Sequence, residues 1–157
     1  MGGDVLVTST ATLEMGRFPE VTAVLAGCPT QAQWFAFAGE FRTLLATRRP
    51  YVLVVDAVAL EVPPPLAVER DFVAALTERR VELGAYALGM AICVSSGLLR
   101  ATVKAVLTAA APRYPYVVLG NVEDGRTWVR HRLVTNFSAE AEGISTVEIV
   151  NKLLAES

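Results

Sequence analysis

The run "YVLVVDA" at residues 51–57 is the feature that most constrains the fold, because five apolar residues follow one another directly before Asp56. A continuous apolar run of strand length is typical of a central strand that is covered on both faces. The runs "ALGMAICVSS" at 87–96 and "YPYVVLGN" at 114–121 have the same character. Stretches with helical spacing separate these runs, and this alternation predicts right-handed crossovers and a largely parallel inner sheet.

The first helix is expected to follow Thr30, a suitable N-cap residue, and to end in a turn that carries Arg48 and Arg49, just before Pro50. Its apolar positions at helical spacing are Trp34, Phe37, Phe41, Leu44 and Leu45. A third helix is expected at residues 96–112, with Ser95 or Ser96 as its cap and Pro112 at its end.

A second helix is expected at residues 63–84, where the prolines set the first turn and Gly84 ends the helix. Its inner face is predicted to hold Leu66, Phe72, Val73, Leu76 and Leu83. Its solvent face is predicted to hold Glu69, Arg70, Glu78, Arg79 and Glu82.

The two ends of the chain complete the expected order. Residues 10–27 contain two β-prone runs around the turn-like "GRFPE" and predict an antiparallel strand pair. "VEDGRTWVRHRLV" predicts a short helix, which the polar "SAEAEG" then breaks. We therefore expect an α/β domain at residues 1–136 and a C-terminal linker with an amphipathic helix at 137–157. The apolar stripe of that last helix is Val147, Val150, Leu153 and Leu154, and it is expected to dock on its own domain or on a partner.

Composition narrows the classes of partner. The chain has 157 residues, of which 53% are hydrophobic, so some apolar surface is expected to face a second subunit, most simply in a homodimer. The net charge of −2 argues against nucleic acid. No apolar run reaches the ~18 residues of a membrane span, and the N-terminus lacks the basic region of a signal peptide. We expect a cytoplasmic protein in which Cys28 and Cys93 are buried thiols.

Asp56 is the first candidate for chemistry, because ligand sites of open α/β sheets lie at the carboxyl ends of strands. The loop that follows has no glycine, serine, threonine or lysine before Leu66, so Asp56 is expected to bond loop amides. Ser95 and Ser96 follow the next strand; they are expected to act as caps, with an anion site as the alternative. An enzyme that uses Asp56 with one of these serines is the least favoured hypothesis.

No cluster of residues suggests a metal, a cofactor or a catalytic set. His131 is the single histidine, lies between two arginines, and is expected on the surface. Trp34 and Trp128 are expected to pack in the core or at its rim, because no basic residues interleave with them as in a nucleic-acid platform. We therefore predict no catalytic residue, no metal site and no cofactor.

The segments "VLVVDAVAL" and "YPYVVLGNVEDGRTWV", in this order of elements, resemble STAS domains of the anti-sigma-factor-antagonist type, in particular divergent SpoIIAA-like members. The resemblance covers residues 10–133. It implies a mixed sheet with an N-terminal antiparallel pair, βαβα crossovers and helices packed on the sheet. STAS switches carry a phosphorylatable serine before the second helix, whereas residues 57–72 of this chain contain neither serine nor threonine.

The predicted function is a non-enzymatic protein-interaction or regulatory scaffold module that lacks the switch serine and binds a regulatory protein. The alternative is a binder of a small apolar ligand such as a lipid, suggested by the aromatic-rich "WFAFAGEF". The candidate binding residues are Asp56, Glu61, Pro64, Ser95, Ser96 and Arg100.

Overall fold

The computed structural model describes residues 8–141. The strands are β1 (Thr10–Arg17), β2 (Glu20–Ala26), β3 (Tyr51–Asp56), β4 (Ala87–Cys93) and β5 (Tyr116–Leu119). The helices are α1 (Gln31–Ala46), α2 (Leu66–Glu78), α3 (Arg80–Tyr86), α4 (Gly97–Ala110) and α5 (Val122–Ala141).

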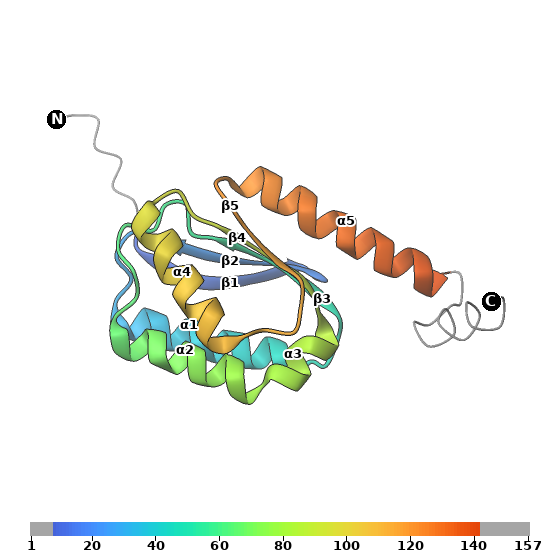
Figure 1. The fold of residues 1–157 in the computed structure, drawn as a ribbon, viewed down its shortest axis with the longest axis horizontal. Helices are drawn as coiled ribbons and strands as arrows, with labels where there is room; N and C mark the ends of the chain where they lie inside the picture. The colour runs from blue at the N-terminus through green and yellow to red at the C-terminus, as the bar shows by residue number, and fades with distance from the viewer. Residues whose placement is uncertain (1–7, 142–157) are drawn as a thin grey trace.

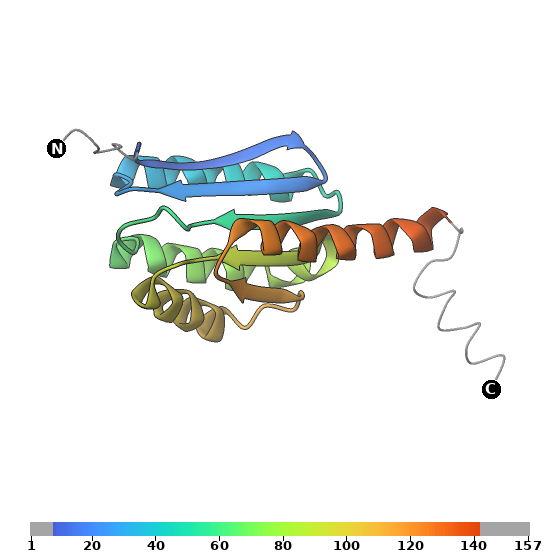
Figure 2. The ribbon, with the colours of Figure 1, turned by 90° about the horizontal axis from the view of Figure 1, so that it is seen from above.

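The strands form one sheet in the order β1-β2-β3-β4-β5, with β1 antiparallel to β2 and all other neighbours parallel (Figure 1). Each crossover from β2 to β5 moves one strand along in the same direction. Right-handed connections of this kind place all their helices on the same face of a sheet. Accordingly α1, α2 and α4 cover one face, while α5 crosses the opposite face over β3 and β4 (Figure 2). The predicted fold class is confirmed.

Side chains of β3 alternate between two cores. Leu53 belongs to the larger core, between the sheet and the helices α1, α2 and α4. Val52 and Val54 belong to a smaller core under α5, together with Ala91, Cys93 and Val129. The continuous apolar run of β3 therefore has the predicted cause, since both of its faces are covered.

Two glycines let α5 lie close to the sheet. A Cβ on Gly125 of α5 would lie 2.6 Å from Cys93 Sγ and 3.3 Å from Ala91 Cβ. A Cβ on Gly89 of β4 would lie 3.1 Å from the ring of Trp128. A Cβ at Gly125 does not fit unless Cys93 or α5 moves, and a Cβ at Gly89 would crowd Trp128 and Arg132, so the two glycines allow α5 to lie close to the sheet.

An ion pair fixes α5 beside β2. The guanidinium of Arg130 donates to both carboxylate oxygens of Glu20, at 3.1 and 3.3 Å, and Arg126 lies 3.7 Å from the same carboxylate. The Glu20 side chain is only 10% exposed, so these charges compensate a carboxylate that has little contact with water.

Helix α1 begins as predicted and ends earlier than predicted. Thr30 forms a capping box with Gln33, whose backbone N–H donates to the threonine hydroxyl at 3.1 Å. Arg48 and Arg49 were expected in the last turn, but the helix ends at Ala46. Since Pro50 disfavours a helical conformation at the residue before it, the chain leaves the helix early, and Arg49 stacks on the ring of Phe18.

The prediction of one helix up to Gly84 is wrong. The helix breaks at Arg79, and Gly84 lies inside the short α3. The direction of α3 is fixed by contacts distant in sequence: Arg80 donates to the carbonyl of Ala110 at the end of α4, and Leu83 is buried. No glycine or proline lies at the break, so the local sequence does not mark the end of α2.

Helix α5 is longer than predicted. It continues through Ser138 to Ala141, where the sequence was expected to leave the helix. Alanine and glutamate are strong helix formers, and the first breaker in this segment is Gly143. The predicted last helix with Val147, Val150, Leu153 and Leu154 lies outside the described residues, and the boundary after residue 136 stays a prediction.

Candidate ligand-binding site

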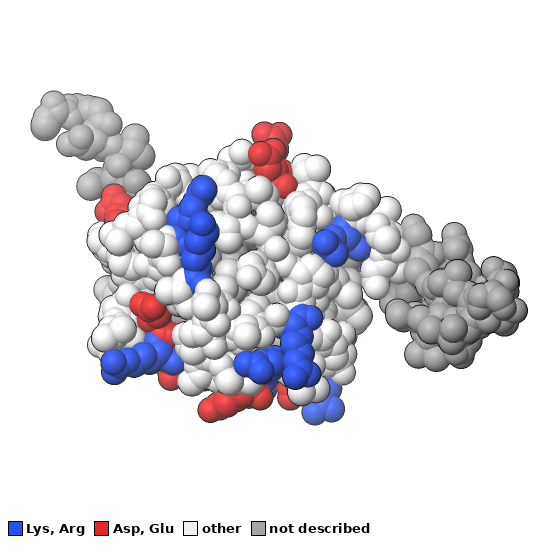
Figure 3. All heavy atoms as spheres, in the orientation of Figure 1, with Lys and Arg blue, Asp and Glu red and all other residues white. Residues whose placement is uncertain are grey.

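A pocket of about 190 Å³ lies between the sheet and the helices α1, α2 and α4. Strands β2, β3 and β4 supply its floor, and the three helices supply its walls. In the orientation of Figure 3, uncharged atoms cover most of the surface, and acidic and basic side chains lie next to one another along its lower part. Its lining includes the apolar side chains of Trp34, Phe37, Phe72, Leu76, Val103 and Leu107, together with Glu69, Thr102 and Tyr114.

Three aromatic rings form the wall between α1 and α2. Trp34 meets Phe37 and Phe72 edge to face, with ring centroids 6.4 and 6.1 Å apart, and Phe37 lies 5.8 Å from Phe72. Edge-to-face contacts of this kind stabilise an aromatic cluster beyond its buried area. Trp34 is thus a packed core residue, as predicted, and its ring also faces the pocket.

The predicted inner face of α2 is correct in part, since Phe72 and Leu76 pack against the larger core. Val68 is its buried residue, whereas Leu66, expected on the inner face, is 60% exposed. Glu69, expected in solvent, is half-buried and lines the pocket.

Polar groups in the pocket are few. Glu69 lies in the first turn of α2, and Thr102 lies in the second turn of α4. Both helices begin beyond the carboxyl ends of parallel strands, so both side chains lie toward the same end of the pocket. At the other end, before β5, burial raises the pKa of Tyr114 to about 12, which keeps its hydroxyl neutral.

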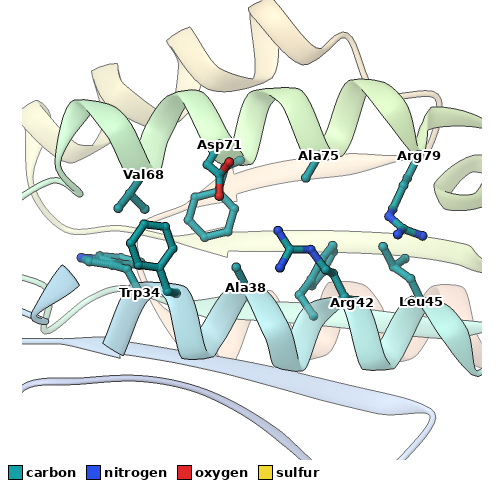
Figure 4. A pocket seen from close by; sticks show the side chains of 11 residues that line it. Trp34, Ala38, Arg42, Leu45, Val68, Asp71, Ala75 and Arg79 are labelled. Atoms are coloured by element: carbon teal, nitrogen blue, oxygen red, sulfur yellow. The ribbon is translucent and has the colours of Figure 1, made fainter. Parts of the chain in front are cut away.

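A second, much smaller hollow of about 20 Å³ lies between α1 and α2, with Arg42 and Asp71 at its rim (Figure 4). Its volume is about that of one water probe, so it has no room for an organic ligand. Phe72 borders both hollows and belongs to the wall that separates them.

Asp56 and Ser95 bind the loop after β3 from two sides. Asp56 Oδ1 accepts a hydrogen bond from the backbone N–H of Val58 at 3.4 Å, and the Ser95 hydroxyl donates to the carbonyl of the same residue at 3.0 Å. The backbone N–H of Glu61 also donates to the carbonyl of Gly27 at 2.9 Å. These bonds hold the loop against its neighbours at the carboxyl edge of the sheet.

The other predicted site residues are spread over the same edge. Ser96 is the N-cap of α4 and accepts from the N–H of Leu99 at 3.3 Å. Arg100 is exposed, and Pro64 is the single one of the six candidates that lines the pocket. The pocket itself was missed in sequence, because its lining comes from seven separate segments and no motif joins them.

The two cysteines differ, and the prediction that both are buried is wrong for Cys28. Its exposed thiol donates to Glu61 Oε2 at 3.3 Å, and this bond raises the pKa of Cys28 above its ordinary value. Cys93 is buried as predicted, and burial raises the pKa of its thiol to about 11. Cys93 is therefore a neutral packing residue under α5.

The single histidine of the chain was predicted to lie on the surface. His131 is exposed on α5, as expected. Residues 8–141 contain no group of three or more histidine, cysteine, aspartate or glutamate side chains placed to hold a metal ion. Within the same residues, no helix combines the length and apolar character that a membrane crossing requires.

Comparison with solved structures identifies the class of fold. The chain is similar to an uncharacterised protein of the DUF3478 family from Shewanella loihica PV-4, described as having a SpoIIAA-like fold. The TM-score is 0.54 at 14% sequence identity, over 78% of this chain and 92% of that chain. At this identity the likeness concerns the fold, and it confirms the predicted SpoIIAA-like architecture. No protein-family model and no curated protein matches the sequence.

Proposed function

We propose that this protein is a non-catalytic binding module whose pocket takes a small apolar ligand, or the apolar chain of a larger one. The observation that carries the proposal is the pocket of about 190 Å³ with an almost entirely apolar lining. An engineered apolar cavity of about 150 Å³ in another protein binds benzene, so this volume suits a ligand of that size or a short alkyl chain.

The expected affinity follows from the buried area. A chain of about six methylenes contributes about 5 kcal/mol when it leaves water, at ~0.8 kcal/mol per methylene. This free energy corresponds to a dissociation constant of roughly 0.1–1 mM before any polar contact is added. The aromatic wall of Trp34, Phe37 and Phe72 is already packed, so little ordering opposes binding.

The non-catalytic part of the proposal rests on the residues that seemed most suited to chemistry. Asp56 and Ser95 both bond to the backbone of Val58, and Ser96 caps α4. Their polar atoms thus stabilise the loop and the helix start, which is the role expected from the sequence for Asp56 and Ser96; Ser95 was expected to cap the helix and instead binds the loop.

Binding can be measured through Trp34 fluorescence, because this side chain lines the pocket while Trp128 belongs to α5 and packs on the opposite face of the sheet. We expect 1-bromohexane, whose bromine quenches indole fluorescence, to quench the Trp128→Phe variant with saturation at sub-millimolar concentration. The Trp34→Phe variant, in which Trp128 is the reporter, is expected to show weak quenching that rises linearly. Linear quenching of equal strength in both variants would contradict the proposal.

A second candidate function, a protein-interaction module, is favoured by a separate observation. Four large apolar side chains are 44–65% exposed where α1, α2 and α4 begin, at the carboxyl edge of the sheet. They are Phe35, Val62, Leu66 and Leu98. A regulatory protein or a second copy of the chain that covered this edge would remove them from water.

We expect self-association through this edge. Sedimentation at micromolar concentration should give a species of twice the 16.8 kDa chain mass, and Leu66→Glu with Leu98→Glu should shift it toward the single chain. Val81→Glu, at a 75% exposed position on α3, is the matched control and should leave the dimer intact. A single-chain species for the unmodified protein would refute the homodimer.

A further inference from the structure

We propose that the interior of the pocket accepts hydrocarbon alone and rejects every ligand that must bury a hydroxyl, an amine or a carboxylate there. The class of ligand is a small hydrocarbon, or a molecule whose hydrocarbon end enters while its single polar end stays in water. Molecules with polar groups at both ends are excluded. The inference rests on the proposed function, because it concerns the chemistry of a ligand held in the same pocket.

The floor of the pocket has no polar group to offer a ligand. It is formed by β2, β3 and β4, which are interior strands with a neighbour on each side. Their backbone N–H and C=O groups therefore serve the hydrogen bonds of the sheet. The side chains that these strands contribute to the floor include Leu25, Leu53, Val55, Met90 and Ile92. A polar ligand group on this floor would lose its water and find no strong partner.

The walls of the pocket are equally poor in polar groups. Because the pocket surface is almost entirely apolar, the polar atoms of Glu69, Thr102 and Tyr114 contribute almost nothing to it. The Thr102 hydroxyl is exposed and donates to the carbonyl of Leu98 at 3.1 Å. Among the described residues, the buried side-chain nitrogen or oxygen that has no partner is Arg80 Nε, and Arg80 does not line the pocket.

The cost of a buried hydroxyl depends on what surrounds it. The cost is greatest in an alkane, where nothing can form a hydrogen bond, and much smaller in octanol, which offers partners. Apolar binding sites reject a ligand of the same shape that carries a hydroxyl by about a hundredfold. This pocket should therefore rank ligands as an alkane does, and each buried hydroxyl should weaken binding more than partition into octanol would indicate.

Three probes with the same carbon ring test the selectivity: cyclohexane, cyclohexanol and trans-1,4-cyclohexanediol. Each would displace 1-bromohexane from the Trp128→Phe protein, with recovery of Trp34 fluorescence as the readout. Each affinity is divided by the octanol–water partition coefficient of the probe. On this corrected scale we expect the diol to bind more weakly than cyclohexane by about tenfold or more. Cyclohexanol should lie between them, because the pocket is partly open to solvent and one hydroxyl can stay in water.

A hydroxyl placed inside the pocket should relax the selectivity. Val103 of α4 lines the pocket, and Val103→Thr changes its polarity at nearly constant volume. A helical threonine donates its proton to the carbonyl four residues earlier, so its oxygen is left to accept from a ligand. The ratio of the affinities for cyclohexane and the diol should fall about tenfold. This ratio does not depend on the fraction of protein that is folded, and a rejection by size alone would not change.

Two further variants keep the test decisive. Val81→Thr, at an exposed position of α3, is the matched control and should leave the ratio unchanged. Ile92→Thr places the same group on the floor of the pocket, and it replaces Val103→Thr if that protein does not fold.

The outcomes separate the two proposals. If the three affinities follow partition into octanol, or if a threonine inside the pocket leaves the ratio unchanged, the selectivity is wrong while the apolar pocket stands. If 1-bromohexane itself shows no saturable binding, the proposed function fails and the selectivity fails with it.

Discussion

Replacing Gly125 by alanine is expected to destabilise the protein by about 1–3 kcal/mol, although alanine is the better helix former. The added methyl group would lie 2.6 Å from Cys93 Sγ and 3.3 Å from Ala91 Cβ, inside the smaller core under α5. Helix α5 would have to move away from the sheet and loosen the contact of Arg130 with Glu20. Thermal unfolding followed by circular dichroism measures the effect.

Two companion variants identify the cause. The same change at Gly39 of α1, where a Cβ meets no atom within 4 Å, should stabilise the protein by about 0.5–1 kcal/mol. Cys93→Ala should partly rescue Gly125→Ala, because it removes the atom nearest to the new methyl group, and the two changes should be clearly non-additive. A Gly125→Ala protein that is as stable as the unmodified one would contradict the close approach of α5.

Filling the pocket should abolish binding without a loss of stability. Val103 of α4 lines the pocket, and the larger side chain of Val103→Phe would occupy the space that a ligand needs. We expect the affinity for 1-bromohexane to fall at least tenfold in Trp34 quenching. The free energy of unfolding should stay equal or rise by about 0.5–2 kcal/mol, as other cavity-filling changes do.

The control for this change is the same substitution outside the pocket. Val81→Phe lies at an exposed position of α3 and should leave the affinity unchanged. If Val103→Phe binds 1-bromohexane as well as the unmodified protein, the ligand does not enter this pocket. If the variant unfolds far more easily, the phenyl ring does not fit into the pocket of about 190 Å³ and overpacks the core beneath α4.

Features encoded by neighbouring residues could be predicted from the sequence. The continuous apolar run of β3 indicates a strand that is covered on both faces, and the spacing of Thr30 and Gln33 indicates a helix start; the structure has both. The mixed sheet follows from the alternation of such segments and from the handedness of crossovers, which are general rules rather than properties of particular residues.

Features that depend on distant contacts could not be predicted. Glu20 and Arg130 are 110 positions apart, and nothing local marks Glu20 as a nearly buried carboxylate. The positions of Leu66 and Glu69 on α2 were predicted wrongly because both faces of the helix contain apolar residues, so the local sequence does not decide which of them lie inside. The pocket is lined by segments that are far apart in the sequence, so it could not be foreseen either.

The placement of three crossover helices on one face and α5 on the other has a mechanical consequence. The five-stranded sheet separates the two sides of the molecule. Entry of a ligand into the pocket would displace α2 and α4 on one face. The contacts of α5 that involve Gly89, Gly125 and Glu20 lie on the other face. The helices on one face can thus open locally while the packing of α5 on the other face is kept. Substitutions on the two faces should therefore change the free energy of unfolding independently of each other.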